Sequence, residues 1–127
     1  LQIQNGGFYS IENPHDSLLF KHPHILQLMN RNHYNVYFDQ CSYGLSLAGC
    51  AKFHYCKKST RLLTNVSALC ELHRVCPGIS AKHKHETAWS TRVLNGKHVH
   101  LAALAGIYPP RLCSRWASLL ARFLAAN

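Results

Sequence analysis

Cysteine and histidine side chains gather in one stretch of the chain at a spacing that could hold a metal ion. Cys76 is followed by His83 and His85, and thiolate sulfur with imidazole nitrogen is a ligand combination that zinc prefers. A fourth ligand would have to approach in space, and the candidates are Cys41, Cys70 and Cys113. The spacing matches no standard zinc finger, and histidine is abundant along the whole chain. The sequence therefore favours a solvated histidine-rich loop and leaves a zinc site as the alternative.

The charge balance predicts an anionic partner. Fourteen lysines and arginines stand against five acidic residues, which gives a formal net charge of +9. Nucleic acid is the usual partner of such a chain, because contacts with phosphates release condensed counterions. Lys57, Lys58 and Arg61 form a basic group that could contact the phosphates of DNA. The alternative is that these charges form a solvated face.

Length and composition limit the class of protein. A chain of 127 residues with 47% hydrophobic and 15% charged residues is typical of one folded domain rather than of a disordered segment. An uninterrupted apolar run of about 18 residues is missing, as is a basic-then-apolar leader, so no membrane span or signal peptide is expected. Six cysteines are fewer than a small disulfide scaffold has, so an intracellular location, nuclear or cytoplasmic, is expected.

The elements that would position these residues follow from local patterns. The chain predicts a strand over 7–11 that ends at Glu12-Asn13-Pro14, a helix over 17–31 broken at Pro23, strands over 34–39 and 60–64, and a short helix over 67–74. Residues 77–98 are polar and lack periodicity, so they are predicted to be a histidine-rich loop.

The last segment has the clearest pattern. After Pro109-Pro110, apolar residues recur at helical spacing, which predicts an amphipathic helix with Trp116 and Phe123 in the core. The order of strands and helices predicts an α/β domain with a layered sheet and a C-terminal amphipathic helix.

Three sequence segments, in this order along the chain, resemble the back half of cytosine-5 DNA methyltransferases. They also resemble the methyltransferase-like domains of phages and retroelement-type polyproteins. The first is the strand that ends in Glu12-Asn13-Pro14. The second is the strand and Tyr43-Gly44 turn over 38–44, with the basic strand that begins at 57–61. The third is the segment 105–112, which ends in a Pro-Pro pair and a helix. The resemblance covers about residues 7 to 125.

The resemblance implies a partial Rossmann-like, methyltransferase-type sheet and a set of roles. Glu12 would face a flipped-out cytosine, where a carboxyl group can bond the ring nitrogen and exocyclic amine. Lys58 and Arg61 would stand where the family has the basic residues of its Gln-x-Arg-x-Arg strand. Pro109 and Pro110 would lie toward the cofactor, S-adenosylmethionine. In this chain Ile107 and Tyr108 replace the Asn-Ala pair of the family's closing segment.

Two parts of such an enzyme are missing from the sequence. The chain has no glycine-rich turn for an adenosyl cofactor and no Pro-Cys nucleophile loop before Glu12. The prediction is therefore a methyltransferase-like domain, or the C-terminal portion of one, over residues 1–127. It would associate with DNA and lack catalysis by itself, with S-adenosylmethionine bound only if an N-terminal half or a partner subunit completes it. The alternatives are a non-catalytic nucleic-acid-binding module with a zinc site and an inactive fragment.

Overall fold

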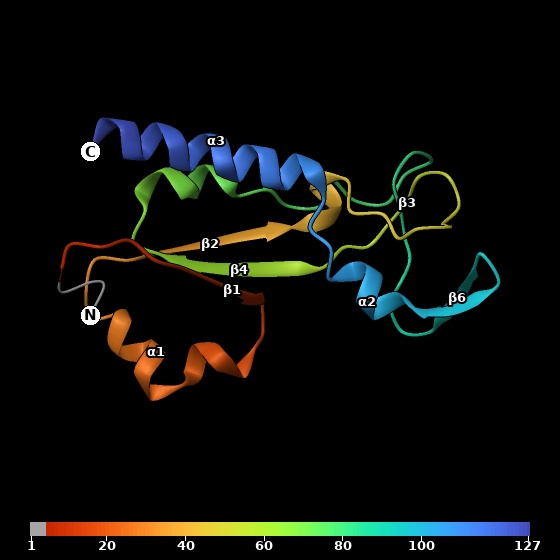
Figure 1. Ribbon diagram of the computed structural model, residues 1–127, viewed down its shortest axis with the longest axis horizontal. Coiled ribbons are helices and arrows are strands. Elements are labelled where there is room, and N and C mark those ends of the chain that lie inside the picture. The colour runs from red at the N-terminus through yellow and green to blue at the C-terminus, as the bar shows by residue number, and fades with distance from the viewer. Residues whose placement is uncertain (1–4) are drawn as a thin grey trace.

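The computed structural model describes residues 5–127 and is a mixed α/β structure with small sheets and a long C-terminal helix (Figure 1). The strands are β1 (Ser10–Pro14), β2 (Tyr34–Asp39), β3 (His54–Tyr55), β4 (Ser59–Thr64), β5 (Lys84–His85), β6 (Thr91–Leu94) and β7 (Lys97–His100). The α-helices are α1 (Pro23–Leu28), α2 (Leu101–Ala105) and α3 (Pro110–Ala126). The 3₁₀ helices are η1 (Leu18–Lys21), η2 (Gln40–Tyr43) and η3 (Ser67–Leu72).

The main sheet has the strand order β1-β4-β2, and β4 runs antiparallel to both neighbours. The two outer strands therefore run parallel to each other. In this register Leu62 on β4 lies opposite Glu12 on β1 and Val36 on β2. The sheet thus places the end of β2, where Cys41 follows, beside the start of β4.

One face of this sheet forms the main core. Side chains alternate across a strand, so Val36, Phe38 and Leu62 point to the same face, where they pack under η3 and α3. Leu112 and Leu119 are seven residues apart on α3, which is two helical turns, and both are buried against this face. Trp116 and Phe123 are half-buried against the same cluster, which confirms the prediction of a core-facing stripe.

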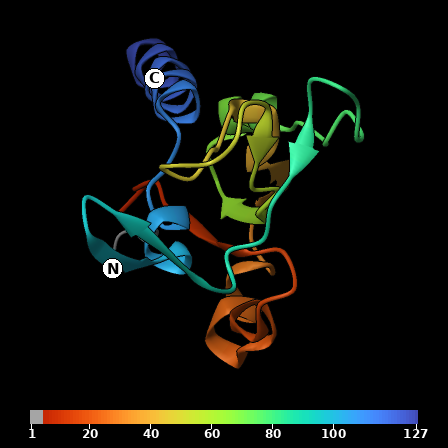
Figure 2. The same cartoon turned by 90° about the vertical axis from the view of Figure 1, so that its right-hand side faces the viewer.

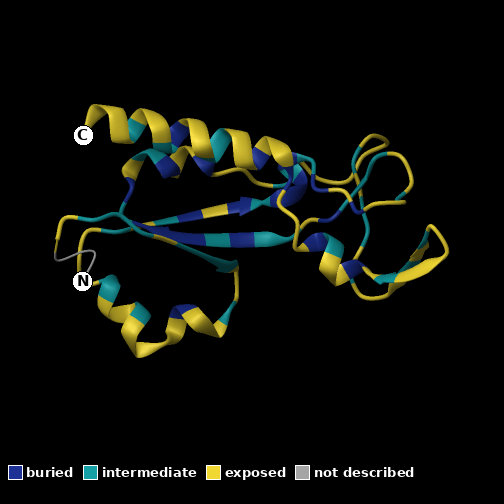
Figure 3. Ribbon diagram, viewed as in Figure 1, coloured by how far each residue is buried: buried dark blue, intermediate teal, exposed yellow. Residues whose placement is uncertain are grey.

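The opposite face of the sheet is covered by the segment of η1 and α1 (Figure 1). Phe20 on η1 is buried, and its ring lies 4.4 Å from the guanidinium carbon of Arg61 on β4. Figure 3 shows buried residues along the sheet, η3 and the inner side of α3, whereas α1 is half-buried or exposed.

A second part of the molecule extends from the carboxyl end of β2, and Figure 2 views it from that end. Its own small core consists of Leu45, Leu47, Cys56, Leu101 and Ala105, all buried. The prediction of a loop over 77–98 is wrong, because this stretch contains β5, β6 and the beginning of β7. Asn95 and Gly96 both have positive φ, at 50° and 77°, and an Asn-Gly pair is the residue choice for a tight two-residue hairpin turn.

The first strand also differs from its prediction. It covers Ser10–Pro14 rather than 7–11, so Glu12, Asn13 and Pro14 are ladder residues and not a loop. Pro14 is tolerated because β1 is an edge strand, where one missing backbone N–H costs no ladder bond with a further strand.

The other predicted elements are confirmed, except that the short helix predicted over 67–74 is the 3₁₀ helix η3, which ends at Leu72. The strands over 34–39 and 60–64 correspond to β2 and β4, and the helix over 17–31 is broken before Pro23 into η1 and α1. The terminal helix begins at Pro110, which occupies its first turn, with Pro109 as N-cap. In the part of the chain that the structure describes, every helix is too short or too polar to cross a membrane.

Candidate metal centre

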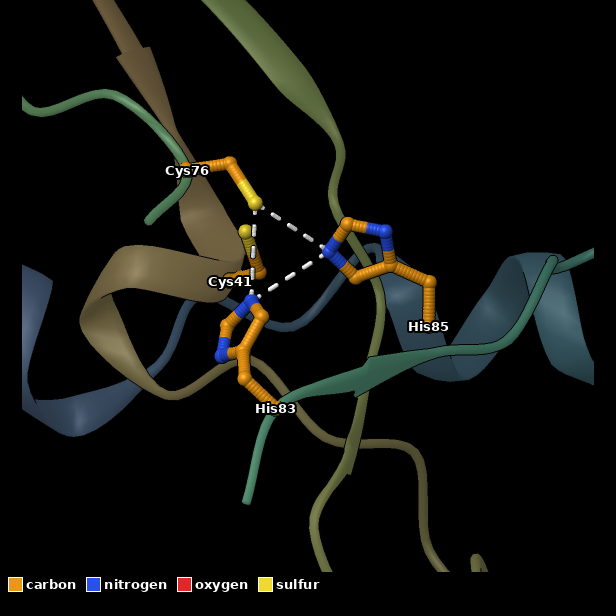
Figure 4. A group of neighbouring side chains, drawn as sticks. All are labelled: Cys41, Cys76, His83 and His85. Atoms are coloured by element: carbon orange, nitrogen blue, oxygen red, sulfur yellow. Dashed lines mark hydrogen bonds between the residues drawn. The ribbon is translucent and has the colours of Figure 1, made fainter. Parts of the chain in front are cut away.

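Four side chains from three separate parts of the chain converge on one point. Cys41, Cys76, His83 and His85 each direct one ligand atom toward the others, and these atoms all lie within 4.8 Å of one another. Figure 4 shows the two sulfur atoms and the two imidazole rings pointing inward. The cluster could hold a metal ion.

The distances match those of a tetrahedral zinc site. Zinc lies about 2.3 Å from thiolate sulfur and about 2.0 Å from imidazole nitrogen, so tetrahedral ligands stand about 3.5 Å apart for sulfur and nitrogen and about 3.3 Å apart for two nitrogens. The Sγ atom of Cys76 lies 3.6 Å from Nε2 of His83 and 3.4 Å from Nε2 of His85. The two Nε2 atoms are 3.3 Å apart. These three distances fit one zinc ion, and Sγ of Cys41 lies within 4.8 Å of each of the three atoms.

Cys41 is placed by the end of β2. It lies in the short helix η2 and is buried, and its backbone N–H donates to the carbonyl of Lys57 next to β4. Gly44 ends this helix with φ 83°, a conformation that glycine adopts without steric cost. Cys41 is thus held rigidly by the main sheet.

Cys76 is tied to the same strand end. Its backbone N–H donates to Oδ2 of Asp39 at 2.7 Å, and an isolated bridge joins Arg74 to Phe38 on β2. The backbone N–H of Gly78 donates to Sγ of Cys76 at 3.4 Å. These hydrogen bonds fix the position of the Cys76 side chain at the end of β2.

His85 lies in β5, and His83 directly precedes this strand. Residues two apart in an extended chain point to the same side, so the spacing of His83 and His85 directs both rings toward Cys76. Strand β5 pairs in parallel with β3 through His54 and Tyr55, and the ring of Tyr55 stacks on His83 with centroids 4.9 Å apart. The pairing and the stacking fix the orientation of the His83 ring.

The environment shifts the proton affinity of two of these groups. Burial, followed by the hydrogen bond and charge of Cys76 and the charge of Asp39, raises the pKa of the Cys41 thiol to about 12. Such a thiol is protonated unless a cation binds, which opposes a role as a free nucleophile. Burial also lowers the pKa of His85, and nearby His83 and Lys57 act in the same direction. A neutral imidazole is the form that binds a metal.

The structure resolves the choice of fourth ligand that the sequence left open. Cys41 completes the predicted group of Cys76, His83 and His85, whereas Cys70 and Cys113 are exposed and do not belong to this cluster. The nearest signal in the sequence is the position of Cys41 directly after a strong strand. Only the pairing of β2 with β4 and the bridge to Arg74 bring it to Cys76.

The other predicted site residues form a second group. The hydroxyl of Tyr108 donates to Oε2 of Glu12 at 2.9 Å. Nζ of Lys58 donates to the carbonyl of Ala105 at 2.7 Å and lies 5.5 Å from the ring of Tyr108. Glu12, Lys58 and the segment that leads to Pro109 and Pro110 are therefore neighbours, although they are far apart in sequence.

Arg61 does not join that group. Its Nε donates to Oδ1 of Asn35, and its guanidinium group lies between the rings of Phe20 and Tyr37. These contacts hold Arg61 against the face of the sheet that η1 covers. Lys57 is exposed and precedes β4.

No family model, no curated protein sequence and no solved structure matches this chain.

Proposed function

We propose that the chain is a zinc-stabilised module that binds nucleic acid and does not itself catalyse a reaction. The observation that carries this proposal is the converged group of Cys41, Cys76, His83 and His85, whose ligand atoms all lie within 4.8 Å of one another. Two thiolates and two imidazoles form a closed set of four ligands, which is typical of structural zinc. A catalytic zinc would keep one position open for water or substrate.

The charge distribution supports nucleic acid as the partner. Glu12, Glu71 and Glu86 are engaged by Tyr108, Arg115 and Arg92, and Asp39 accepts from Ser59 and from the backbone of Cys76. Four of the five acidic residues therefore have partners within the chain. The excess of positive charge remains on the surface, where phosphates would neutralise it.

The zinc part of this proposal is tested by metal analysis of the purified chain. We expect about one zinc per chain, and cobalt substitution should give the visible bands of a tetrahedral site with thiolate ligands. The variant Cys76→Ala should lose the metal, and Cys76→His should keep it because a ligand is conserved. Cys113→Ala is the matched control, since this cysteine is exposed and outside the cluster. Equal metal content in all four proteins would contradict the site.

The nucleic-acid part is tested by fluorescence anisotropy with labelled duplex DNA over a range of salt concentrations. We expect affinity to fall linearly on a logarithmic salt scale, because each phosphate contact releases counterions. Binding that is absent at low salt would contradict this partner, whatever the metal content.

The methyltransferase-like reading is the second candidate, and a specific observation favours it. Glu12, Lys58 and the segment 105–110 lie together. Each of them belongs to one of the three segments on which the resemblance rests. In this candidate the β1-β4-β2 sheet is part of a larger Rossmann-like sheet, and S-adenosylmethionine is bound with the help of residues outside this chain. Glu12 would then contact a flipped-out cytosine.

This second candidate has a test that uses the chain alone. A duplex with cytosine opposite an abasic site offers an unpaired base, which costs less to flip than a paired one. If Glu12 reads that base, the chain should prefer this duplex over one with adenine at the same position, and Glu12→Gln should remove the preference. Glu71→Gln is the control, because Glu71 is an exposed acid on η3. Equal binding of both duplexes would contradict the role of Glu12.

A further inference from the structure

Three arginines line one concave part of the surface at the start of α3. Arg74, Arg111 and Arg115 surround a pocket of about 490 Å³ together with Tyr43, Pro110 and Ser114. Arg111 and Arg115 are four residues apart on α3 and therefore lie on the same side of the helix. Arg74 reaches the pocket from the connection after η3.

The structure supports each side of this pocket. The guanidinium carbon of Arg74 lies 4.7 Å from the ring centre of Tyr43, and Nη1 donates to the carbonyl of Ser42 at 3.4 Å. The hydroxyl of Tyr43 donates to the carbonyl of Leu72 at 2.6 Å, so this ring is itself fixed. Arg111 lies over Gly44, where a Cβ atom would stand 3.7 Å from its Nη1.

The positive charge of the pocket is poorly compensated within the chain. Glu71 contacts Arg115 at 3.3 Å, but it also faces Arg122 at 3.9 Å. Within residues 5–127, no acidic side chain forms an ion pair with Arg74 or Arg111. Like charges held close together repel, and an anion that binds between them removes this cost. Guanidinium groups bind phosphate through two parallel hydrogen bonds, which makes phosphate the fitting anion.

We propose that the pocket of Arg74, Arg111 and Arg115 binds a backbone phosphate of nucleic acid. This site deepens the proposed function and rests on its choice of nucleic acid as partner. Arg74 is two residues before Cys76, and Arg111 also lines the adjacent pocket of about 310 Å³, which includes Cys41 and His83.

The experiment compares two arginines of the same helix. Arg111→Gln removes a charge from the pocket, and Arg122→Gln removes the same charge from α3 outside it. Binding of a labelled duplex is measured by fluorescence anisotropy at several salt concentrations. The zinc content and the NMR spectrum of the backbone amides of each variant verify that it is folded. We expect Arg111→Gln to weaken binding roughly three- to tenfold and to reduce the salt slope by about 0.9, the value for one lost phosphate contact. Arg122→Gln should change both quantities much less.

The possible results distinguish failure of the arginine pocket from failure of the proposed function. Equal effects of the two variants, with duplex binding intact, would overturn the pocket and leave the zinc and nucleic-acid proposals standing. A chain that binds no duplex at any salt would overturn both the pocket and the nucleic-acid partner. In a second experiment, inorganic phosphate is titrated while the backbone amide signals of residues 43–44, 74 and 111–115 are followed. Shifts with phosphate but not with duplex would mean that the pocket takes free phosphate, which overturns the assignment to nucleic acid.

Discussion

At the scale of single residues, Tyr108 connects the two ends of the sequence. Its hydroxyl donates to the carboxylate of Glu12 on the edge strand β1, 96 residues earlier in the chain. Partial burial of the phenol raises the pKa of Tyr108 to about 12, and the hydrogen bond and charge of Glu12 contribute in the same direction. The carboxylate thus favours the protonated phenol.

This shift predicts a loss of stability in alkali. The folded pKa lies above the ordinary value of 10.0, so the contribution of Tyr108 is complete below pH 10 and declines as the pH rises toward 12. We expect Tyr108→Phe to be less stable than the parent chain at neutral pH, with a difference that shrinks between pH 10 and 12. The free energy of unfolding in urea, measured across this range, checks the prediction.

The control for this prediction is another tyrosine that is similarly exposed. Tyr34 on β2 is 39% exposed and Tyr108 is 40% exposed. The effect specific to Tyr108 is the change with pH that Tyr34→Phe does not reproduce. A constant difference for Tyr108→Phe would show that its hydroxyl contributes nothing that depends on ionisation.

At the scale of elements, the β6–β7 hairpin is held against the loop that follows η2. Arg92 on β6 donates to the carbonyl of Ala48 at 2.7 Å and forms an ion pair with Glu86. Gly49 lies directly under the hairpin, because a Cβ atom there would stand 2.8 Å from Leu94 and 2.9 Å from Arg92. Arg92 is therefore a structural residue that fixes the position of the hairpin.

Gly49 and Gly96 have nearly the same positive φ but different surroundings, so their substitution distinguishes backbone strain from packing. Gly49 has φ 78° and Gly96 has φ 77°, but a Cβ atom on Gly96 would meet nothing within 4 Å. We expect Gly96→Ala to cost about 1 kcal/mol from backbone strain alone. Gly49→Ala should cost the same strain plus about 1–3 kcal/mol from overpacking against the hairpin. Denaturant unfolding of both variants measures the difference, and equal costs would mean that the hairpin does not pack on Gly49.

At the scale of the whole molecule, the cluster of Cys41, Cys76, His83 and His85 lies between the main core and the smaller second core. The main core lies between the sheet, η3 and α3, and the second core lies under α2 and the loop after η2. Cys41 and Cys76 belong to the end of the main sheet, whereas His83 and His85 belong to the second part. Removal of a bound metal would loosen this connection without exposing the main core.

Chelation should therefore unfold the molecule in part. With zinc removed, we expect amide hydrogens of residues 76–100 to exchange faster, because the histidines lose their fixed partners. Protection in β2 and β4 should remain, since their side chains are buried independently of the metal. Hydrogen exchange before and after treatment with a chelator gives this map. Uniform loss of protection would show that the two parts unfold as one unit, and unchanged exchange would contradict a structural metal.

Several features of this protein were determined by the sequence alone. The stripe of Leu112, Trp116, Leu119 and Phe123 predicts α3, and the β-rich segments over 34–39 and 60–64 predict β2 and β4. These predictions are confirmed because helical and extended periodicities are local properties. The Asn95-Gly96 turn was also readable from the sequence, but the polar composition of 77–98 led to the wrong prediction of a loop. The resemblance to cytosine-5 methyltransferases stays a prediction.

The tertiary structure decided which residues meet. Cys41 becomes the fourth member of the cluster through the order β1-β4-β2 and the bridge from Phe38 to Arg74. The same arrangement places Arg61 between aromatic rings and gathers Arg74 with Arg111. Pairing between segments that are 20 or more residues apart depends on how buried faces fit together in three dimensions, and no short pattern in the chain encodes that fit. The sequence therefore indicated Cys76, His83 and His85 as candidate ligands and the excess of positive charge. Only the tertiary structure identified Cys41 as the fourth member of the cluster and brought the arginines of the pocket together.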